Sequence, residues 1–388
     1  MTARNAIAAL AALGLAAAAA VAARPAPPRA TAAVVAPDTT AGGWRLALAP
    51  YAFRFPRDHA AHPAYRTEWW YYTGELRSGA RTFGFELTFF RVGIGRADAA
   101  EQGPSASAWR VRELVLAHAA LTDEARRTFV YDEVAARPAL GLAGADSARY
   151  RVWAGGWSAG LAADGVTHAL RAATPRFALD LALVPRQPPA VHGAGGVSAK
   201  GAERGAASHY YSIPRLAVTG RLARGRDTLT VAGEAWMDHE FSSSVLAPSQ
   251  AGWDWFAVRL DDGRALMLYV LRRTGGAVEP ASSGSLITAD GRVTHLPLGA
   301  FEARATGRWR SPRSGAVYPH GWRVRVPGAA LDLALEPTVD DQELVTASTG
   351  GVTYWEGAVR VRGTAGGRAV AGRGYVELTG YDGPPPGR

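Results

Sequence analysis

The chain of 388 residues is long enough for two globular domains, and its 48% of hydrophobic residues can fill two sizeable cores. It contains no cysteine, which excludes disulfides, thiol catalysis and cysteine-based zinc sites. The net charge is +9, but the basic residues are dispersed, and Lys200 is the only lysine among the 43. Because a surface that follows nucleic-acid phosphates needs clustered basic residues, we expect no nucleic-acid partner. Peripheral contact with an anionic membrane surface stays open.

The N-terminus has the three parts of a secretory signal peptide. Arg4 supplies a positive charge, residues 6–21 are almost entirely apolar, and Ala20-Val21-Ala22 offers small residues for cleavage. The apolar run of 16 residues is shorter than the roughly 20 that span a bilayer, and an uncleaved anchor is the alternative. We expect a signal peptide at residues 1–23, a disordered Pro- and Ala-rich tether at 24–43, and a periplasmic or secreted mature protein.

Two series of strands follow the tether. Residues 82–89 place four apolar side chains on one face, and a turn at 78–81 joins them to the aromatic-rich strand 68–77. Asp261-Asp262-Gly263 predicts another hairpin, because these residue types tolerate positive φ. The first series comprises residues 68–77, 82–89, 110–121, 148–161, 177–184 and 228–237; the second comprises 253–260, 264–271, 285–288, 293–296, 301–309, 321–326, 331–335, 354–362 and 374–378. This pattern predicts an all-β protein of two barrels or sandwiches, with a boundary near residues 240–250.

Residues 185–207 interrupt the strands with 23 residues rich in Gly, Pro, Ala and Ser. A loop of this length inside a domain is usually functional or disordered. The segment is therefore either a lid over the mouth of a barrel or an ordinary insertion.

Four consecutive aromatic residues at 69–72 follow Glu68 on the first strand. Their side chains alternate, so that Trp69 and Tyr71 face one side and the other two face the opposite side. They form either the wall of a barrel or a π-lined cavity for an apolar ligand. Glu68 stands beside this wall, where a carboxylate is costly unless it is paired. Trp253 and Trp255, which open the second series, allow the same two interpretations.

Asp238 is the main candidate for chemistry. It follows Trp236 by two residues and shares its strand face, and a carboxyl group against an indole has a raised pKa that can hold a proton near neutrality. A hydrogen-bonded carboxylate at the end of a strand is the structural alternative. His209 and Tyr211 share one face of an earlier strand, where they belong either to a site or to an aromatic wall.

Motifs for cofactors and metals are missing. His59 and His62 are three residues apart, but they lie in a Pro-flanked loop with no acidic third ligand, so we expect no metal site. The sequence has neither the phosphate-cradling Gly-x-x-x-x-Gly-Lys pattern nor a dinucleotide fingerprint. We therefore expect an activity that requires no metal and no organic cofactor.

Four segments of the chain are distinctive: EWWYYTG at 68–74, FGFELTFFR at 83–91, WMDHE at 236–240 and QAGWDWF at 250–256. They resemble the AttH-like family, which is often labelled "predicted secreted hydrolase" and is related to carotenoid 1,2-hydratase (hydroxyneurosporene synthase). The resemblance extends over about residues 44–381. It implies two tandem lipocalin-like domains after the signal peptide, at residues 44–240 and 241–388.

The related hydratases add water to a terminal isoprenoid double bond without a cofactor. The resemblance implies that Asp238 protonates the alkene, with Trp236, His209 and Tyr211 around the resulting cation. Two positions depart from the hydratases, which have Tyr where this chain has Trp236 and Trp where it has Tyr211. Both exchanges keep a π face for a cation.

Two functions of different classes follow. One is an enzyme that adds water to, or rearranges, an apolar isoprenoid, polyene or lipid, with Asp238 as the acid and His209 orienting it or the water. The ligand-binding residues would be Glu68, Trp69, Tyr71, Trp253 and Trp255. The other is a non-catalytic, periplasmic, lipocalin-like carrier of a hydrophobic ligand, accessory to an ABC-type exporter, because family members tend to be encoded near such exporters. An acid kept protonated in the cavity distinguishes the enzyme from the carrier.

Overall fold

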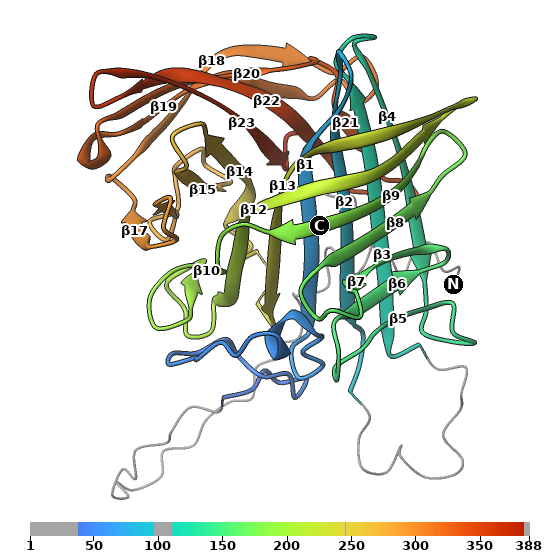
Figure 1. Ribbon diagram of the computed structural model, residues 1–388. Coiled ribbons are helices and arrows are strands. Elements are labelled where there is room, and N and C mark those ends of the chain that lie inside the picture. Colours follow the sequence, from blue (N-terminus) through green and yellow to red (C-terminus); the bar gives the residue numbers. More distant parts are fainter. Residues whose placement is uncertain (1–37, 97–110, 245, 384–388) are drawn as a thin grey trace, which may run out of the picture.

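The computed structural model describes residues 38–96, 111–244 and 246–383, in which the long elements are all β-strands (Figure 1). The predicted signal peptide and residues 24–37 of the predicted tether lie outside the described residues. Two short 3-10 helices are described, η1 (Arg57–His59) and η3 (Pro327–Ala329). Within these ranges, no helix has the length and apolar character needed to cross a membrane. The predicted all-β class is confirmed.

The first sheet is antiparallel and pairs its strands in the order β4-β3-β2-β1-β13-β12-β9-β8-β7-β6-β5, while β10 and β11 also pair with β12. Its strands are β1 (Thr67–Ser78), β2 (Arg81–Gly93), β3 (Glu113–Asp123), β4 (Thr128–Ala136), β5 (Ala143–Ala145), β6 (Arg151–Ala154), β7 (Trp157–Leu161), β8 (His168–Ala173), β9 (Ala178–Pro185), β10 (Ala190–Val191), β11 (Ser198–Ala199), β12 (Ala207–Arg224) and β13 (Asp227–Ser242). The turn between β1 and β2 needs a positive φ at Gly79, which has a φ of 56°.

The second sheet is also antiparallel, in the order β17-β16-β15-β14-β23-β22-β20-β19-β18, with β21 paired to β22. Its strands are β14 (Gln250–Leu260), β15 (Ala265–Arg273), β16 (Ser283–Ile287), β17 (Val293–Pro297), β18 (Glu302–Arg310), β19 (Val317–Val326), β20 (Leu331–Pro337), β21 (Glu343–Val345), β22 (Thr353–Ala365) and β23 (Arg368–Thr379). The change of sheet thus falls between Ser242 and Gln250. The domain limit at residues 240/241 stays a prediction.

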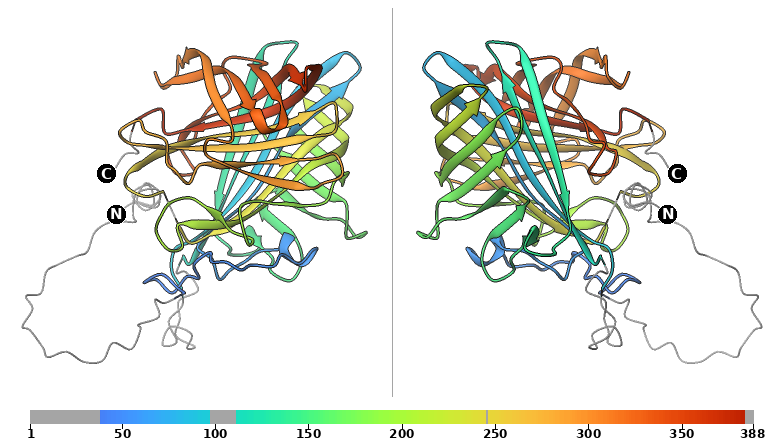
Figure 2. Two further views of the ribbon diagram at one scale, coloured as in Figure 1. Left: turned by 90° about the vertical axis from the view of Figure 1, so that its left-hand side faces the viewer. Right: turned by 90° about the vertical axis from the view of Figure 1, so that its right-hand side faces the viewer.

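Both sheets curl, and one face of the first packs against the second (Figure 2). In the first sheet β5 and β6 return to lie against β3, which curls it toward a barrel. The second sheet forms a half-barrel whose strands β22 and β23 contact β2 and β1. This arrangement is the lipocalin-like architecture that the sequence predicts.

The aromatic run on β1 explains how the two sheets are joined. Trp70 and Tyr72 point into the hydrophobic core of the first sheet. Tyr71 points the other way, into a separate cluster between the sheets that also holds Trp236 and Trp255. A strand with both faces buried lacks the usual alternation of apolar and polar residues. The four consecutive aromatics therefore serve two different layers.

Several parts of the first sheet differ from the prediction. Residues 148–161 are expected as one strand, but they form the hairpin of β6 and β7, because the turn residue Gly155 has a φ of 57°. Strands β4, β5 and β8 are not predicted at all, and β12 is predicted only around residues 208–212. On β8 buried and exposed residues do alternate, but the buried positions are His168, Leu170 and Ala172, a weak hydrophobic signal.

Residues 185–207 form a strap that ties the two sheets together. Its short strands β10 and β11 pair with β12 of the first sheet. Toward the second sheet, Nε2 of Gln187 lies 3.2 Å from the carbonyl oxygens of Gly263, Thr288 and Ala289, which share its two N–H donors. The strap brings His192 and Lys200 into the layer between the sheets.

Candidate functional site

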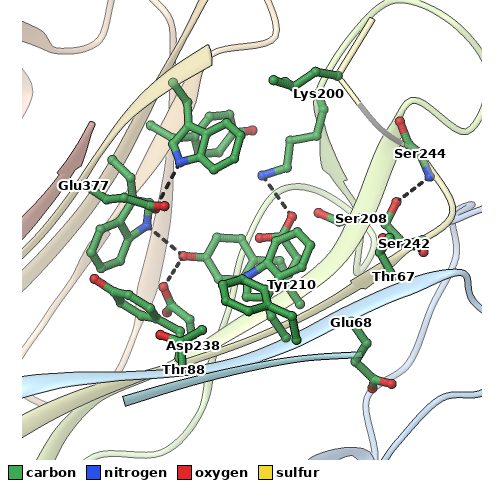
Figure 3. Close-up of a pocket in the computed structure, with 18 of the residues that line it drawn as sticks. Thr67, Glu68, Thr88, Lys200, Ser208, Tyr210, Asp238, Ser242, Ser244 and Glu377 are labelled. Atoms are coloured by element: carbon green, nitrogen blue, oxygen red, sulfur yellow. Dashed lines mark hydrogen bonds and ion pairs between the residues drawn. The ribbon is translucent and has the colours of Figure 1, made fainter. Parts of the chain in front are cut away.

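A cavity of about 420 Å³ lies between the two sheets (Figure 3). The outer face of the first sheet forms one wall, and strands of the second sheet form the other. Trp69, Tyr71, Trp253 and Trp255 line this cavity together with Asp238. The structure therefore brings four predicted ligand-binding residues to the predicted acid.

The register of the first sheet places Asp238 in the middle of its wall. Tyr71 on β1 and Ser212 on β12 are the cross-strand partners of Asp238 on β13. Side chains at directly paired positions point to the same face of a sheet. Trp236 lies on this face as well, two residues before the acid, as the sequence predicts. Its indole is fully buried in the cluster between the sheets, beside the carboxyl group, and does not itself line the cavity.

Asp238 is almost entirely buried and accepts three hydrogen bonds. The hydroxyl of Tyr210 donates to its Oδ2 at 2.8 Å, and the indole N–H of Trp236 donates to its Oδ1 at 2.6 Å. The hydroxyl of Ser212 also donates to Oδ1. Burial raises the pKa of Asp238 to about 7, although these three hydrogen bonds favour the ionised form and lower it. The carboxyl group can therefore exchange a proton near neutral pH.

A chain of hydrogen bonds leads from Asp238 across the interface. The Oγ of Ser212 is 2.6 Å from Nε2 of His192, and Nδ1 of that ring is 2.8 Å from Oγ of Ser285 on β16. Burial lowers the pKa of His192 to about 3, so the ring is neutral and has one donor and one acceptor nitrogen. Sequence reasoning missed His192, because it lies in the Gly- and Pro-rich strap.

Five further carboxyl residues line the cavity, and three of them, Glu86, Glu356 and Glu377, have raised pKa values. Burial raises the pKa of Glu86 to about 8 and that of Glu377 to about 7. Burial together with the charges of the other two raises the pKa of Glu356 well above its usual value. The local sequence contains a signal for each, since a glutamate interrupts an apolar strand at every one of these positions.

Lys200 of the strap also reaches the cavity. Its ammonium is 3.2 Å from a carboxylate oxygen of Glu240 and 3.9 Å from the centre of the Tyr269 ring. Burial alone would lower the pKa of Lys200, but the charge of Glu240 raises it overall. The single lysine of the chain is thus a charged group of the site, a role that its rarity in the composition could have indicated.

His209 and Tyr211 lie on the opposite face of the first sheet from Asp238. The hydroxyl of Tyr211 is 2.6 Å from Nδ1 of His59, inside the barrel, and His209 stacks on Tyr51 with a centroid distance of 4.1 Å. The expectation that His209 orients the acid or its water is therefore wrong for this geometry. Consecutive residues of a strand point to opposite faces, so Tyr210 and Ser212, rather than His209 and Tyr211, hold the positions beside Asp238.

Glu68 contributes to the cavity wall, but its carboxylate turns away from the cavity (Figure 3). It lies 2.8 Å from both Nδ1 of His62 and Nε2 of His239, and it accepts a 3.0 Å hydrogen bond from Arg91. Burial would raise the pKa of Glu68, but these partners hold it well below its usual range. The expectation that His62 has no acidic neighbour is wrong, because Asp58 lies 3.3 Å from it as well.

The donor atoms of His62, Glu68 and His239 all lie within 4.8 Å of one another, a spacing that could hold a metal ion. The carboxylate already has the Arg91 guanidinium and the backbone N–H of His62 as partners. A second cation would therefore meet a positive charge at the same carboxylate. The cluster is a buried network of ion pairs, and the metal-free activity stays a prediction.

Residues 156–160 match the Gly-x-Ser-x-Gly pattern of hydrolases. In those enzymes the serine lies at a sharp turn between a strand and a helix. Here Ser158 lies within strand β7, and that strand continues into a hairpin with β8. This geometry does not support a serine nucleophile.

A family model described as AttH-like matches residues 46–381. Among solved structures, an AttH from Nitrosomonas europaea is 35% identical, covers 87% of this chain and 99% of its own, and superposes with a TM-score of 0.78. Kievitone hydratase from Nectria haematococca is 13% identical over 88% of this chain and 95% of its own, with a TM-score of 0.64. A structure of CghA with Sch210972 is 15% identical over 82% and 90%, with a TM-score of 0.51. The last two share the fold. No curated protein matches the chain.

Proposed function

The chain belongs to the AttH-like family, and we propose that it is a cofactor-independent acid catalyst acting on an apolar unsaturated molecule of the isoprenoid, polyene or lipid class. Asp238 carries the proposal, because it is a buried carboxyl group with a pKa of about 7 in an aromatic-lined cavity. The hydratase-like fold, shared with a protein named kievitone hydratase, supports the same class of reaction.

The proposed reaction adds water across a carbon–carbon double bond. Protonated Asp238 gives its proton to one carbon, which leaves a carbocation on the other. The rings of Trp69, Tyr71 and Trp255 line the same cavity and offer π faces to that cation. A water molecule adds to the cation, and its released proton restores the acid. The reaction therefore consumes water and no net proton.

The test has two stages. Native mass spectrometry of the purified protein with its co-purifying lipids identifies the ligand class, and turnover is then measured on that compound. Asp238→Asn keeps the shape and the hydrogen-bond acceptor but removes the transferable proton. We expect it to lower turnover at least about 100-fold, which is the contribution of a general acid, while ligand binding and melting temperature change little.

Asp254→Asn is a matched control for this substitution. Asp254 is a half-buried carboxyl group, bonded to Arg272 and Tyr381, and it does not line the cavity. We expect its variant to turn the substrate over at the wild-type rate. Wild-type turnover by Asp238→Asn, or a large fall in its melting temperature, would contradict the catalytic role.

A non-catalytic carrier of a hydrophobic ligand is the second candidate. One observation favours it: both carboxylate oxygens of Asp238 already accept hydrogen bonds within the protein, from Tyr210, Trp236 and Ser212. A carrier accessory to an ABC-type exporter would release its ligand chemically unchanged. Incubation of the protein with the identified ligand, followed by mass spectrometry, separates the candidates, because water addition increases the mass by one water.

We also propose that the protein works outside the cytoplasm. The pattern of residues 1–23 supports export, and the absence of cysteine suits a protein that folds without oxidation. N-terminal sequencing of the periplasmic protein should give a first residue near Ala23 or Arg24. An intact Met1 in the soluble cytoplasmic fraction would contradict this location.

A further inference from the structure

We propose that Glu86, Glu356 and Glu377 form a recognition site for an ammonium group, so that the ligand of the cavity is an apolar molecule with a basic amine. The inference rests on the proposed function only in using the same cavity. It names the class of ligand, whereas Asp238 determines what happens to that ligand.

The three carboxyl groups come together from both sheets. Glu356 on β22 and Glu377 on β23 are directly paired across neighbouring strands. Glu86 comes from β2 of the first sheet, and the Tyr71 hydroxyl joins the two sheets by donating a 2.6 Å hydrogen bond to Glu356. Like charges directly opposite each other destabilise a sheet. Ionising these carboxyl groups together is therefore costly in the empty protein and becomes favourable when a cation is bound.

The carboxyl groups lack partners that a ligand could supply. Thr88 donates to Oε1 of Glu86 at 2.5 Å, but Oε2 of Glu86 and Oε2 of Glu356 have no hydrogen-bond partner, and each side chain belongs to a residue that is only 1% exposed. Among the described residues, none of the three glutamates makes an ion pair, unlike Glu240 in the same cavity. An unpartnered buried carboxyl oxygen is costly, so these positions call for a hydrogen-bonding ligand.

The surroundings favour a cation over a neutral hydroxyl group. The rings of Tyr71, Trp255 and Tyr354 line the cavity with the glutamates, and aromatic faces attract ammonium groups. Figure 3 shows Glu377 held by an indole, a 3.0 Å bond from Trp253, rather than by a positively charged side chain. The one ammonium of the protein in this cavity, Lys200, is paired with Glu240. The three glutamates, which have no positively charged partner among the described residues, are therefore complementary to a ligand with an ammonium group.

Ammonium binding should be coupled to proton release. Burial raises the pKa of Glu86 and Glu377 to about 8 and about 7, so the empty site holds protons at neutral pH. An ammonium favours the ionised carboxylates and expels those protons. Other titratable groups also face the three glutamates: Tyr71 from β1, Tyr354 and Tyr375 from β22 and β23, and Asp238 and Glu240 from β13.

The first experiment compares three probes with the same alkyl chain: decylamine, decanol and decanoate. Binding to the purified mature protein is followed by fluorescence of the tryptophans in the cavity wall. We expect decylamine to bind at least about tenfold more tightly than decanol, the factor expected for a hydrogen bond to a charged group, and decanoate to bind most weakly. Equal affinity for amine and alcohol, or a preference for decanoate, would overturn the proposal.

Substitutions then locate the preference. Glu356→Gln and Glu377→Gln should each reduce the ratio of amine to alcohol affinity about tenfold without weakening decanol. Glu343→Gln is the control, because Glu343 is a fully buried glutamate of the second sheet outside the cavity lining. If the ratio is unchanged in both cavity variants, the site is not the one proposed.

A measurement on the wild-type protein keeps the proposal testable if a variant does not fold. Calorimetric titration in two buffers of different ionisation enthalpy should show proton release with decylamine and none with decanol, and equal values would refute the coupling. Asp238→Asn separates this inference from the proposed reaction. It should keep the amine preference even though it removes turnover, so the two conclusions can fail independently.

Discussion

The proton of Asp238 is shared with groups that have no charge of their own. Ser212 and His192 connect the carboxyl group to Ser285, and each member of this chain can either donate or accept. The proton that restores Asp238 comes from the added water in the cavity, and neither His192 nor Ser285 lines that cavity. The neutral His192 therefore acts as a positioning residue, because it fixes the orientation of the Ser212 hydroxyl that donates to Asp238.

His192→Gln tests this role. The glutamine amide keeps a donor and an acceptor, so the fold should lose less than about 1–2 kcal/mol, but it cannot hold the Ser212 hydroxyl in the geometry that the imidazole ring fixes. We expect kcat on the identified substrate to fall about tenfold while KM stays near the wild-type value, because the acid is then oriented less well toward the reacting carbon. His118→Gln is the control, because His118 is also buried between the sheets with two hydroxyl partners, Tyr354 and Thr349. An equal loss in both variants would mean that His192 has only a structural role.

Strand β12 shows what a sequence predicts about an element and what it leaves open. The alternation of side chains correctly puts His209 and Tyr211 on one face, and Trp236 with Asp238 on one face of β13. Whether Asp238 shares a face with His209 and Tyr211 or with Tyr210 and Ser212 depends on the register between β12 and β13. That register is set by contacts distant in sequence. The structure pairs Ser212 with Asp238, so the residues missed by the prediction, Tyr210 and Ser212, are the ones beside the acid.

The two neighbouring tyrosines of β12 give a direct test of this register. Tyr210→Phe removes a hydrogen bond that lowers the pKa of Asp238, so the acid should stay protonated to a higher pH and the alkaline limit of activity should move upward. Tyr211→Phe removes contacts with His59 and His239 on the other face and should leave that limit unchanged. The pH dependence of Trp236 fluorescence gives the same comparison without a substrate, because its indole donates to Asp238. Similar shifts in both variants would contradict the assignment of faces.

At the scale of the whole molecule, the fold class and most strands were predictable, whereas the composition of the interface was not. Local alternation and turn residues mark the hairpins, and these depend on neighbours in sequence. The cavity depends on the packing of one sheet against the other, which brings Glu86 close to residues such as Glu377, far along the chain. No local sequence pattern predicts that Glu86 and Glu377 lie close together. The strands can therefore be predicted from the sequence, whereas the grouping of the cavity carboxyl residues is seen only in the folded structure.

This interface makes a prediction about the stability of the whole protein above neutral pH. The pKa of Glu86 is raised to about 8, and the pKa values of Asp238 and Glu377 are raised to about 7, because burial favours their neutral forms. A carboxyl group with a raised pKa in the folded state stabilises at low pH, and this contribution is lost as the pH rises through the folded value. Between pH 7 and 9, Glu86 alone should lower the free energy of unfolding by about 1 kcal/mol.

The buried histidines have little effect on stability between pH 7 and pH 9. Burial lowers the pKa of several histidines, including His59 and His192 to about 3, so they reduce stability only at pH values where unfolded histidine is protonated. Thermal melting of the wild type should therefore decrease from pH 7 to pH 9. Glu86→Gln should flatten the decrease, because glutamine has no proton to lose, whereas Glu302→Gln, at an exposed position of β18, should not. A melting temperature that stays constant or rises over this range would show that the buried glutamates do not hold protons in the folded protein.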